Sequence, residues 1–313
     1  MKIALLFSGQ YRPFNKELFQ KSLNNLVEDI NYSIFSFSWA ETSRSLTYSE
    51  NNDQIEKLPD IENIIQDIFS GFNLVNYEIE SFEKFKDNLS DQYVNILNSK
   101  EFHHGTINSL PQIYAIYKSY KLLLPLISNY DLVFRCRFDS LFIHPLRIYD
   151  LEKLRETNNL YNINFGRAFN PCRVYDIFFG GSIKATYFLK DIWYELPRFV
   201  FNRYDNYLDK RDSCRLIYLA ALNNNINTKS LNTRICDVYR MDKDLNYEKY
   251  IIKSHITRFT LNKSSFLIFL YLYKWFQYRK ISYYYYLIWI FKSFLVLPIA
   301  FLKRLKYLKM QTK

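Results

Sequence analysis

The chain has 313 residues, of which 49% are hydrophobic and 19% aromatic, and only six are glycine. This length allows a sizeable buried core, and so little glycine excludes Gly-rich repeats, propellers and disordered linkers. The formal net charge is +11, but 13 of the 42 basic residues and none of the 31 acidic residues follow Glu248. Residues 1–248 therefore carry a slight net negative charge. A nucleic-acid-binding enzyme more often spreads a basic patch over its folded domain, so we expect no nucleic-acid partner.

The pattern of apolar residues predicts strands and helices that alternate along the first two-thirds of the chain. Pro111 suits the first turn of a helix at residues 110–124, and Pro125 marks its end. The polar stretch 41–60 is typical of a loop. Strands are predicted at residues 3–7, 32–39, 74–79, 132–134 and 160–165, and helices at residues 16–29, 61–68, 110–124, 187–194 and 213–223. This alternation favours an α/β fold.

The stretch from Asp131 to Phe142 is the most informative in the chain, because Arg135, Arg137 and Asp139 follow directly on a buried strand. Charged side chains in such a place are costly to desolvate unless they are paired or bind a ligand. Ligands of open α/β sheets bind at the carboxyl ends of the strands. Two guanidinium groups suit a diphosphate, and the carboxylate suits a metal ion or a sugar hydroxyl. The alternative is an internal Arg–Asp ion pair that only orders a loop.

A second candidate segment follows the first strand, where residues 8–12 read Ser8-Gly9-Gln10-Tyr11-Arg12. A small-residue turn after a strand is where an α/β fold begins a nucleotide site. The segment lacks both a GxGxxG pattern and a Walker lysine, so neither a dinucleotide-binding fold nor a P-loop is supported.

Two further candidates have a plain structural alternative. Lys118 lies on the polar face of the helix at residues 110–124, where a solvated lysine is the commoner case, although it could approach Arg135 and Asp139. Asp176 precedes an aromatic strand and a Gly-Gly turn at Gly180 and Gly181, and turn or cap roles are the commoner ones for aspartate.

Four short motifs occur in a fixed order: Ser8-Gly9-Gln10-x-Arg12, Tyr114-x-x-Tyr117-Lys118, Arg135-x-Arg137-x-Asp139 and Asp176-x-Phe-Phe-Gly-Gly. Together they resemble bacterial surface-polysaccharide glycosyltransferases of the GT-A type, similar to the WavE-like lipopolysaccharide biosynthesis proteins. The resemblance covers roughly residues 1–240 and implies a nucleotide-binding α/β sandwich with a central mixed, mostly parallel sheet. Ser8, Gly9, Gln10 and Arg12 would then line the nucleotide side, with Lys118, Arg135 and Arg137 also serving the donor.

The resemblance also implies a metal-binding role for Asp139, in the place of the last carboxylate of the family's Asp-x-Asp motif. This chain has Arg137 where the first carboxylate would stand, so Mn²⁺ or Mg²⁺ would meet a single carboxylate, and the two arginines could instead neutralise the leaving diphosphate themselves. An inverting enzyme also needs a carboxylate to deprotonate the acceptor hydroxyl. Asp176 is our candidate for that base, and Asp212 is the alternative.

The cysteines and the N-terminus bear on the compartment. Cys136, Cys172, Cys214 and Cys236 form no CxxC pair, which gives a zinc site little support and fits a reducing compartment. The apolar run at residues 3–7 is too short for a convincing signal peptide. We therefore expect the body of the protein in the cytoplasm.

The C-terminal segment at residues 263–313 is apolar, aromatic and basic. Its longest apolar run, residues 281–302, approaches the ~20 residues that span a bilayer, but Lys292 and Pro298 interrupt it. We expect helices that lie on the inner face of the cell membrane, with basic residues facing anionic lipid. The alternative is a helical subdomain packed on the body, or a dimerisation surface.

These observations predict two domains, a GT-A-like catalytic domain at residues 1–262 and a membrane-associating tail at residues 263–313. The predicted function is transfer of a sugar from a nucleotide-sugar donor onto lipopolysaccharide, capsule or another surface glycan, which can be lipid-linked. A non-catalytic scaffold of the same pathway is the first alternative, because the first carboxylate is missing. A nucleic-acid-binding protein is the second, because the isoelectric point is near 9.2 and aromatic residues are many.

Overall fold

The computed structural model describes residues 1–11, 15–43, 55–98, 105–162, 174–201, 213–231 and 236–238. The predictions for Arg12, for Asp212 and for the tail at residues 263–313 fall outside these ranges. Among the described residues, no helix combines the length and the apolar character needed to cross a bilayer.

A seven-stranded sheet forms the centre of the described fold, with strand order β10-β8-β9-β6-β1-β2-β5. Every neighbouring pair is parallel except for the two that include β9, which runs antiparallel to both β6 and β8. The predicted mixed, mostly parallel sheet is therefore confirmed. The strands are β1 (Lys2–Gly9), β2 (Asn31–Trp39), β5 (Leu74–Glu80), β6 (Leu132–Cys136), β8 (Asn159–Asn162), β9 (Phe178–Ser182) and β10 (Asn227–Ser230).

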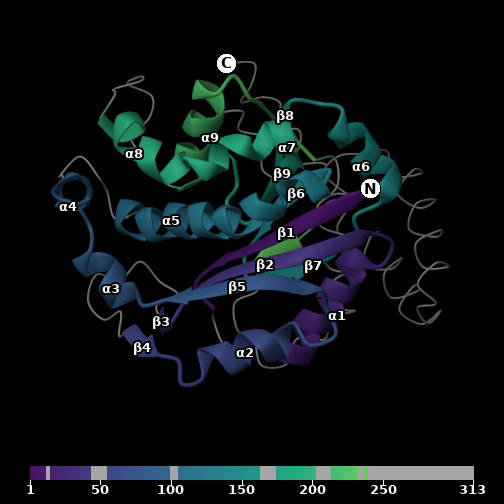
Figure 1. Ribbon diagram of the computed structural model, residues 1–313, viewed down its shortest axis with the longest axis horizontal. Helices are drawn as coiled ribbons and strands as arrows, with labels where there is room; N and C mark the ends of the chain where they lie inside the picture. Colours follow the sequence, from purple (N-terminus) through teal and green to yellow (C-terminus); the bar gives the residue numbers. More distant parts are fainter. Residues whose placement is uncertain are drawn as a thin grey trace, which may run out of the picture. The chain divides into compact units, whose positions relative to one another are not determined.

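Helices cover both faces of this sheet (Figure 1). Helix α5 packs along β1 and β2 on one face, with α8 and α9 beside it, and α1 and α2 lie on the other face. Alternate residues of β1 belong to the two cores: Ala4 and Leu6 face α5, whereas Ile3 and Leu5 face α1 and α2. The helices are α1 (Lys16–Val27), α2 (Ile61–Ile68), α3 (Phe82–Asp87), α4 (Asp91–Asn98), α5 (Gly105–Leu123), α6 (Ile148–Arg155), α7 (Ile183–Thr186), α8 (Ile192–Phe201) and α9 (Ser213–Asn223).

Short elements complete the described fold. Two 3-10 helices, η1 (Leu124–Asn129) and η2 (Tyr187–Lys190), follow α5 and α7. Strand β7 (Ser140–Phe142) pairs antiparallel with β11 (Cys236–Val238), and β3 (Glu41–Ser43) pairs antiparallel with β4 (Ile55–Lys57). The stretch 41–60, predicted as loop, thus contains two short strands. Three residues each are too few for a period of two to stand out against a polar background.

Two local predictions for helices were wrong. Pro111 lies inside α5 rather than in its first turn, because the helix begins at Gly105, before the apolar spacing that marked it becomes visible. The helix predicted at residues 187–194 is divided between η2 and α8, with Asp191 between them. In both cases the apolar residues show which face is buried without fixing where the backbone turns begin.

The predicted Gly-Gly turn was also wrong, because Gly180 and Gly181 lie inside strand β9. A β-carbon on Gly180 would lie 2.1 Å from the carbonyl oxygen of Val133 and 2.5 Å from a ring carbon of Phe134, both on the neighbouring strand β6. Glycine is required here because the two strands and the stacked ring of Phe134 leave no room for a side chain.

We expect Gly180→Ala to lower the free energy of unfolding by at least about 1–3 kcal/mol, because the methyl group must push β9 away from β6. Urea denaturation of the variant and the wild type measures this difference. An unchanged midpoint would show that β6 and β9 can separate without cost and would contradict the close approach.

Candidate functional site

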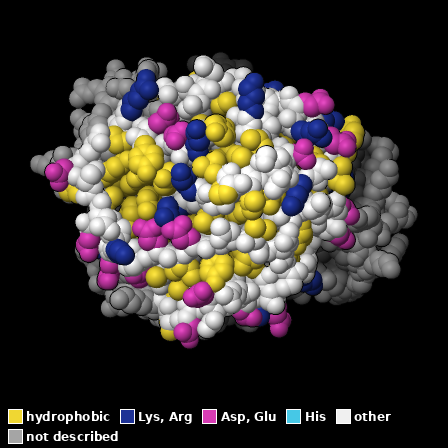
Figure 2. Space-filling view, viewed as in Figure 1, with side chains coloured by type: hydrophobic (Ala, Val, Ile, Leu, Met, Phe, Trp, Pro, Cys, Tyr) yellow, Lys and Arg dark blue, Asp and Glu magenta, His cyan; other side chains and the backbone are white. Residues whose placement is uncertain are grey.

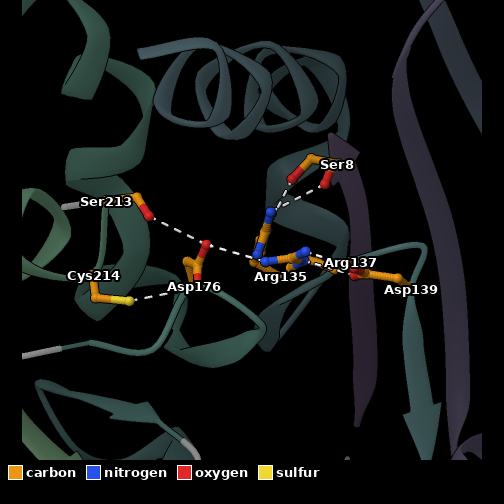
Figure 3. Close-up of polar contacts among 7 residues, drawn as sticks. All are labelled: Ser8, Arg135, Arg137, Asp139, Asp176, Ser213 and Cys214. Atoms are coloured by element: carbon orange, nitrogen blue, oxygen red, sulfur yellow. Dashed lines mark hydrogen bonds and ion pairs between the residues drawn. The ribbon is translucent and has the colours of Figure 1, made fainter. Parts of the chain in front are cut away.

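The candidate site lies at one edge of the sheet, where β1, β2, β5 and β6 all end because they are parallel. Strand β9 runs the opposite way, so its first residue, Phe178, is paired with Cys136 at the end of β6. Asp176 precedes β9 by two residues and therefore reaches the same edge. The topology brings together Ser8, Arg135, Arg137, Asp139 and Asp176, as Figure 3 shows. This is the carboxyl edge, at which α/β sheets bind ligands.

Arg135 is fully buried and holds the end of strand β1. Its Nε donates a hydrogen bond to the Ser8 Oγ and its Nη2 to the Ser8 carbonyl oxygen, each at 3.0 Å. Its Nη1 has no hydrogen-bond partner within the described ranges. Burial lowers the pKa of Arg135 to about 10, so the guanidinium stays positive at neutral pH. Arg135 thus places a buried positive charge against the end of β1, at Ser8.

Arg137 joins the two candidate carboxylates. Its Nε and Nη2 donate to the two carboxylate oxygens of Asp139 at 2.7 and 2.6 Å, in the bidentate geometry of strong Arg–carboxylate pairs. Its Nη1 lies 3.5 Å from Oδ2 of Asp176, a long contact. Burial alone lowers the pKa of Arg137, but the charges of Asp139 and Asp176 raise this pKa above its ordinary value. The Arg–Asp ion pair considered from sequence is therefore present, and it lies at the edge where a ligand would bind.

Asp176 has two further partners at the start of helix α9. The Ser213 hydroxyl lies 3.2 Å from Oδ2 of Asp176, and the Cys214 thiol lies 3.5 Å from Oδ1. The Asp176 side chain is only 10% exposed. Ser213 and Cys214 could not be found from local sequence pattern, because their approach to Asp176 depends on how α9 packs against the sheet.

The remaining predicted residues are placed as follows. Ser8 and Gly9, predicted in the turn after the first strand, are the last two residues of β1. Gly9 has φ +120°, which L-residues with a side chain rarely adopt, so the end of this strand depends on glycine. Gln10 follows it and is half-buried. Arg12 and Asp212 lie outside the described residues, so their roles stay predictions.

Lys118 is directed to a different part of the same edge. Its Nζ lies 2.5 Å from Glu78 and 3.3 Å from Glu80, both on β5, and the Tyr114 hydroxyl is 3.1 Å from each oxygen of Glu80. Since β2 lies between β1 and β5, this group is about 10 Å across the sheet from Ser8. Lys118 is thus not placed with Asp139, and Glu78 and Glu80, which reasoning from sequence missed, are its partners.

The residues present do not fit a divalent metal at Asp139. Both of its carboxylate oxygens already accept hydrogen bonds from Arg137, and a metal there would lie beside a guanidinium charge. Within the described ranges, no three His, Cys, Asp or Glu side chains are grouped as metal ligands. Binding of Mn²⁺ or Mg²⁺ at Asp139 would require Arg137 to move away.

A surface pocket lies at the opposite edge of the sheet, around Asp131 before β6 and Ser182 at the end of β9. Its main charged pair is Arg155 and Asp131, at 3.4 Å, and Asp131 also accepts from the Lys2 backbone N–H. Arg155 is more than half exposed, so the pair is well solvated. We favour the carboxyl edge as the functional site because its charged side chains, from the end of β6 and the start of β9, have little exposure and meet polar groups of β1 and α9.

Comparison with known proteins adds a weak structural likeness. No protein-family model matches the sequence, and no curated protein matches it. The galactosyltransferase LgtC, in complex with donor and acceptor sugar analogs, is 12% identical over 74% of this chain and 73% of its own, with a TM-score of 0.38. The apo form of mouse xyloside xylosyltransferase 1 is 10% identical over 74% and 84% of the two chains, with a TM-score of 0.39. Likeness of this degree does not assign an activity.

Proposed function

We propose that this protein is a GT-A-like glycosyltransferase that moves a sugar from a nucleotide-sugar donor onto a surface glycan acceptor. One observation carries the proposal. At the carboxyl edge of the sheet, the buried Arg135, which is hydrogen-bonded to Ser8, lies beside the ion-paired cluster of Arg137, Asp139 and Asp176. Two arginines and two aspartates with so little exposure carry a large desolvation cost. A role in ordering a loop does not require that cost.

The proposed chemistry uses a positive group for the donor phosphate, Arg137, and a negative group for the acceptor proton, Asp176, which lie 3.5 Å apart at the carboxyl edge. In a direct displacement, the acceptor oxygen gives its proton to Asp176 while it bonds to the anomeric carbon. The bond from that carbon to the donor phosphate breaks, and its electron pair leaves with the phosphate. Arg137 would stabilise the phosphate, and Arg135 holds the end of β1 at Ser8, which would face the nucleotide.

The acceptor and the location belong to the same proposal. A lipopolysaccharide, capsule or lipid-linked acceptor is supported by the order of the four motifs and by the basic aromatic tail at residues 263–313. The body would lie in the cytoplasm, with the tail on the inner face of the cell membrane. On the face shown in Figure 2, acidic and basic side chains are interspersed rather than gathered by sign, which favours a sugar nucleotide over a nucleic acid as the ligand.

The test is a thermal-shift screen of the full chain against UDP, GDP, CMP and their sugars. A ligand at 100 times its Kd stabilises the folded state by about 2.7 kcal/mol, which raises the Tm by several degrees. We expect one nucleotide class to do so.

Two matched variants locate the binding site. Arg137→Lys keeps the charge but loses the forked donor, so we expect the nucleotide shift to shrink. Arg155→Lys makes the same change at the opposite edge of the sheet and should leave the shift intact. A well-folded protein that responds to no nucleotide would favour the scaffold alternative, and an undiminished shift in Arg137→Lys would place the nucleotide elsewhere.

A further inference from the structure

Arg137 occupies the position that a bound cation would take between the two carboxylates. It contacts three carboxylate oxygens, two of Asp139 and one of Asp176, at 2.7, 2.6 and 3.5 Å. Bridging carboxylates in this way is the usual work of Mg²⁺ or Mn²⁺, which bind through one or two carboxylates and the substrate phosphates. Here a covalently attached side chain makes the bridge.

Arg137 keeps its positive charge in the folded protein. The charges of Asp139 and Asp176 keep the pKa of Arg137 above its ordinary value, so it stays protonated wherever the protein is folded at moderate pH. Asp139 is only 4% exposed and both of its oxygens are engaged, so an incoming metal would have to displace a buried bidentate pair. It would also have to approach a like charge. Arg137 therefore disfavours metal binding at the place where Asp139 would otherwise support it.

The guanidinium retains donors for a ligand. An arginine has five N–H bonds, and the contacts with Asp139 and Asp176 use three of them. The other two, one on each Nη, have no acceptor among the described residues, and the side chain is 18% exposed. A phosphate oxygen could accept them while Asp139 holds the guanidinium in place. The order carboxylate, cation, phosphate is then the same as in a metal-bridged site.

We infer that Arg137 is the resident cation of this site and that the donor diphosphate is bound and neutralised without a divalent metal. The inference rests on the proposed function and specifies how that site works. When the bond from the anomeric carbon to the phosphate breaks, the electron pair goes to the phosphate oxygen and Arg137 stabilises the new charge through hydrogen bonds. Asp139 is then a positioning residue for Arg137, not a metal ligand.

The first measurement is the Kd of the full chain for UDP and for GDP, in EDTA and in Mn²⁺. We expect the ratio of the two Kd values to be about 1 for the nucleotide that binds. A Kd that EDTA raises and Mn²⁺ restores would overturn the inference and leave the proposed function standing. No binding in either condition would contradict the proposed function and the diphosphate part of the inference, and the metal titration below would then decide only whether Asp139 is a metal ligand.

The second measurement is independent of nucleotide and of activity. Free Mn²⁺ gives an EPR signal that weakens on binding, so a titration of the full chain with Mn²⁺ reports any metal site. We expect Asp139→Asn to bind as much Mn²⁺ as the wild type, and as much as Asp131→Asn, the same change at the opposite edge of the sheet. Mn²⁺ binding that is lost in Asp139→Asn and kept in Asp131→Asn would show that Asp139 is a metal ligand and overturn the inference.

Discussion

Replacing Arg137 by alanine should lower the free energy of unfolding by about 3–5 kcal/mol, because it removes the positive member of a buried group of charges. Asp139, at 4% exposure, would lose the bidentate partner that its two oxygens contact at 2.7 and 2.6 Å. Asp176 would lose its nearest described positive charge as well. Urea denaturation followed by circular dichroism measures the loss.

Arg155→Ala is the matched control for this prediction. Arg155 also pairs with an aspartate, Asp131, but it is 59% exposed and the contact is 3.4 Å. Solvated pairs of this kind contribute between zero and about 1 kcal/mol. Equal losses in the two variants would mean that burial of the Arg137 pair is unimportant, and it would remove the energetic argument for a functional cluster. A double variant, Arg137→Ala with Asp139→Asn, should recover part of the stability because it also removes the buried carboxylate that Arg137 had neutralised.

The fold was largely predictable because its strands and long helices carry clear patterns. The strand predicted at residues 3–7 and the helix at residues 61–68 are present as β1 and α2, and the helix at residues 213–223 is α9. Short or polar elements such as α3, α6 and the β3–β4 pair gave no periodic signal. The antiparallel course of β9 could not be foreseen either, because the direction of a strand depends on its crossover and not on its own residues.

The site was predictable only where its residues are close in sequence. Arg135, Arg137 and Asp139 stand within five residues, so their chemistry was visible at once. Which guanidinium meets which partner was not visible. Arg135 and Arg137 lie one strand period apart, so the pleat alone would send them to the same face. The structure instead sends Arg135 to Ser8, because Arg135 lies in β6 beside β1, whereas Arg137 follows the end of β6.

Lys118 shows why proximity in sequence is a poor guide across a sheet. Helix α5 leads through η1 into β6, which suggested that Lys118 could approach Arg135 and Asp139. Helix α5 instead packs over β1 and β2 and also contacts β5, so Lys118 lies beside Glu78 and Glu80 of β5. The strand order β6-β1-β2-β5 determines this distance, and the sequence contains no local signal for it.

Asp176 is the residue for which a single isosteric change gives the largest expected effect on rate. General bases contribute about 10²–10⁴-fold to catalysis, so Asp176→Asn should slow sugar transfer, and hydrolysis of the donor, by that factor. Asparagine keeps one side-chain oxygen, which can still accept from the Ser213 hydroxyl at the start of α9, while the Cys214 thiol would face the amide nitrogen. The amide cannot take a proton from the acceptor, whereas Arg135 and Arg137 still serve the phosphate. Binding of the nucleotide should therefore be unchanged.

The comparison that decides the role of Asp176 is a split between binding and turnover. With the sugar nucleotide that raises the Tm as the donor, Asp176→Asn should show the wild-type Kd for that donor and a greatly reduced kcat. Asp131→Asn, which removes a carboxylate at the opposite edge of the sheet, should change neither. A wild-type kcat in Asp176→Asn would exclude this residue as the base and leave Asp212 as the remaining candidate. A parallel loss of binding and turnover would instead mean that Asp176 acts through Arg137, as a positioning residue for the phosphate site.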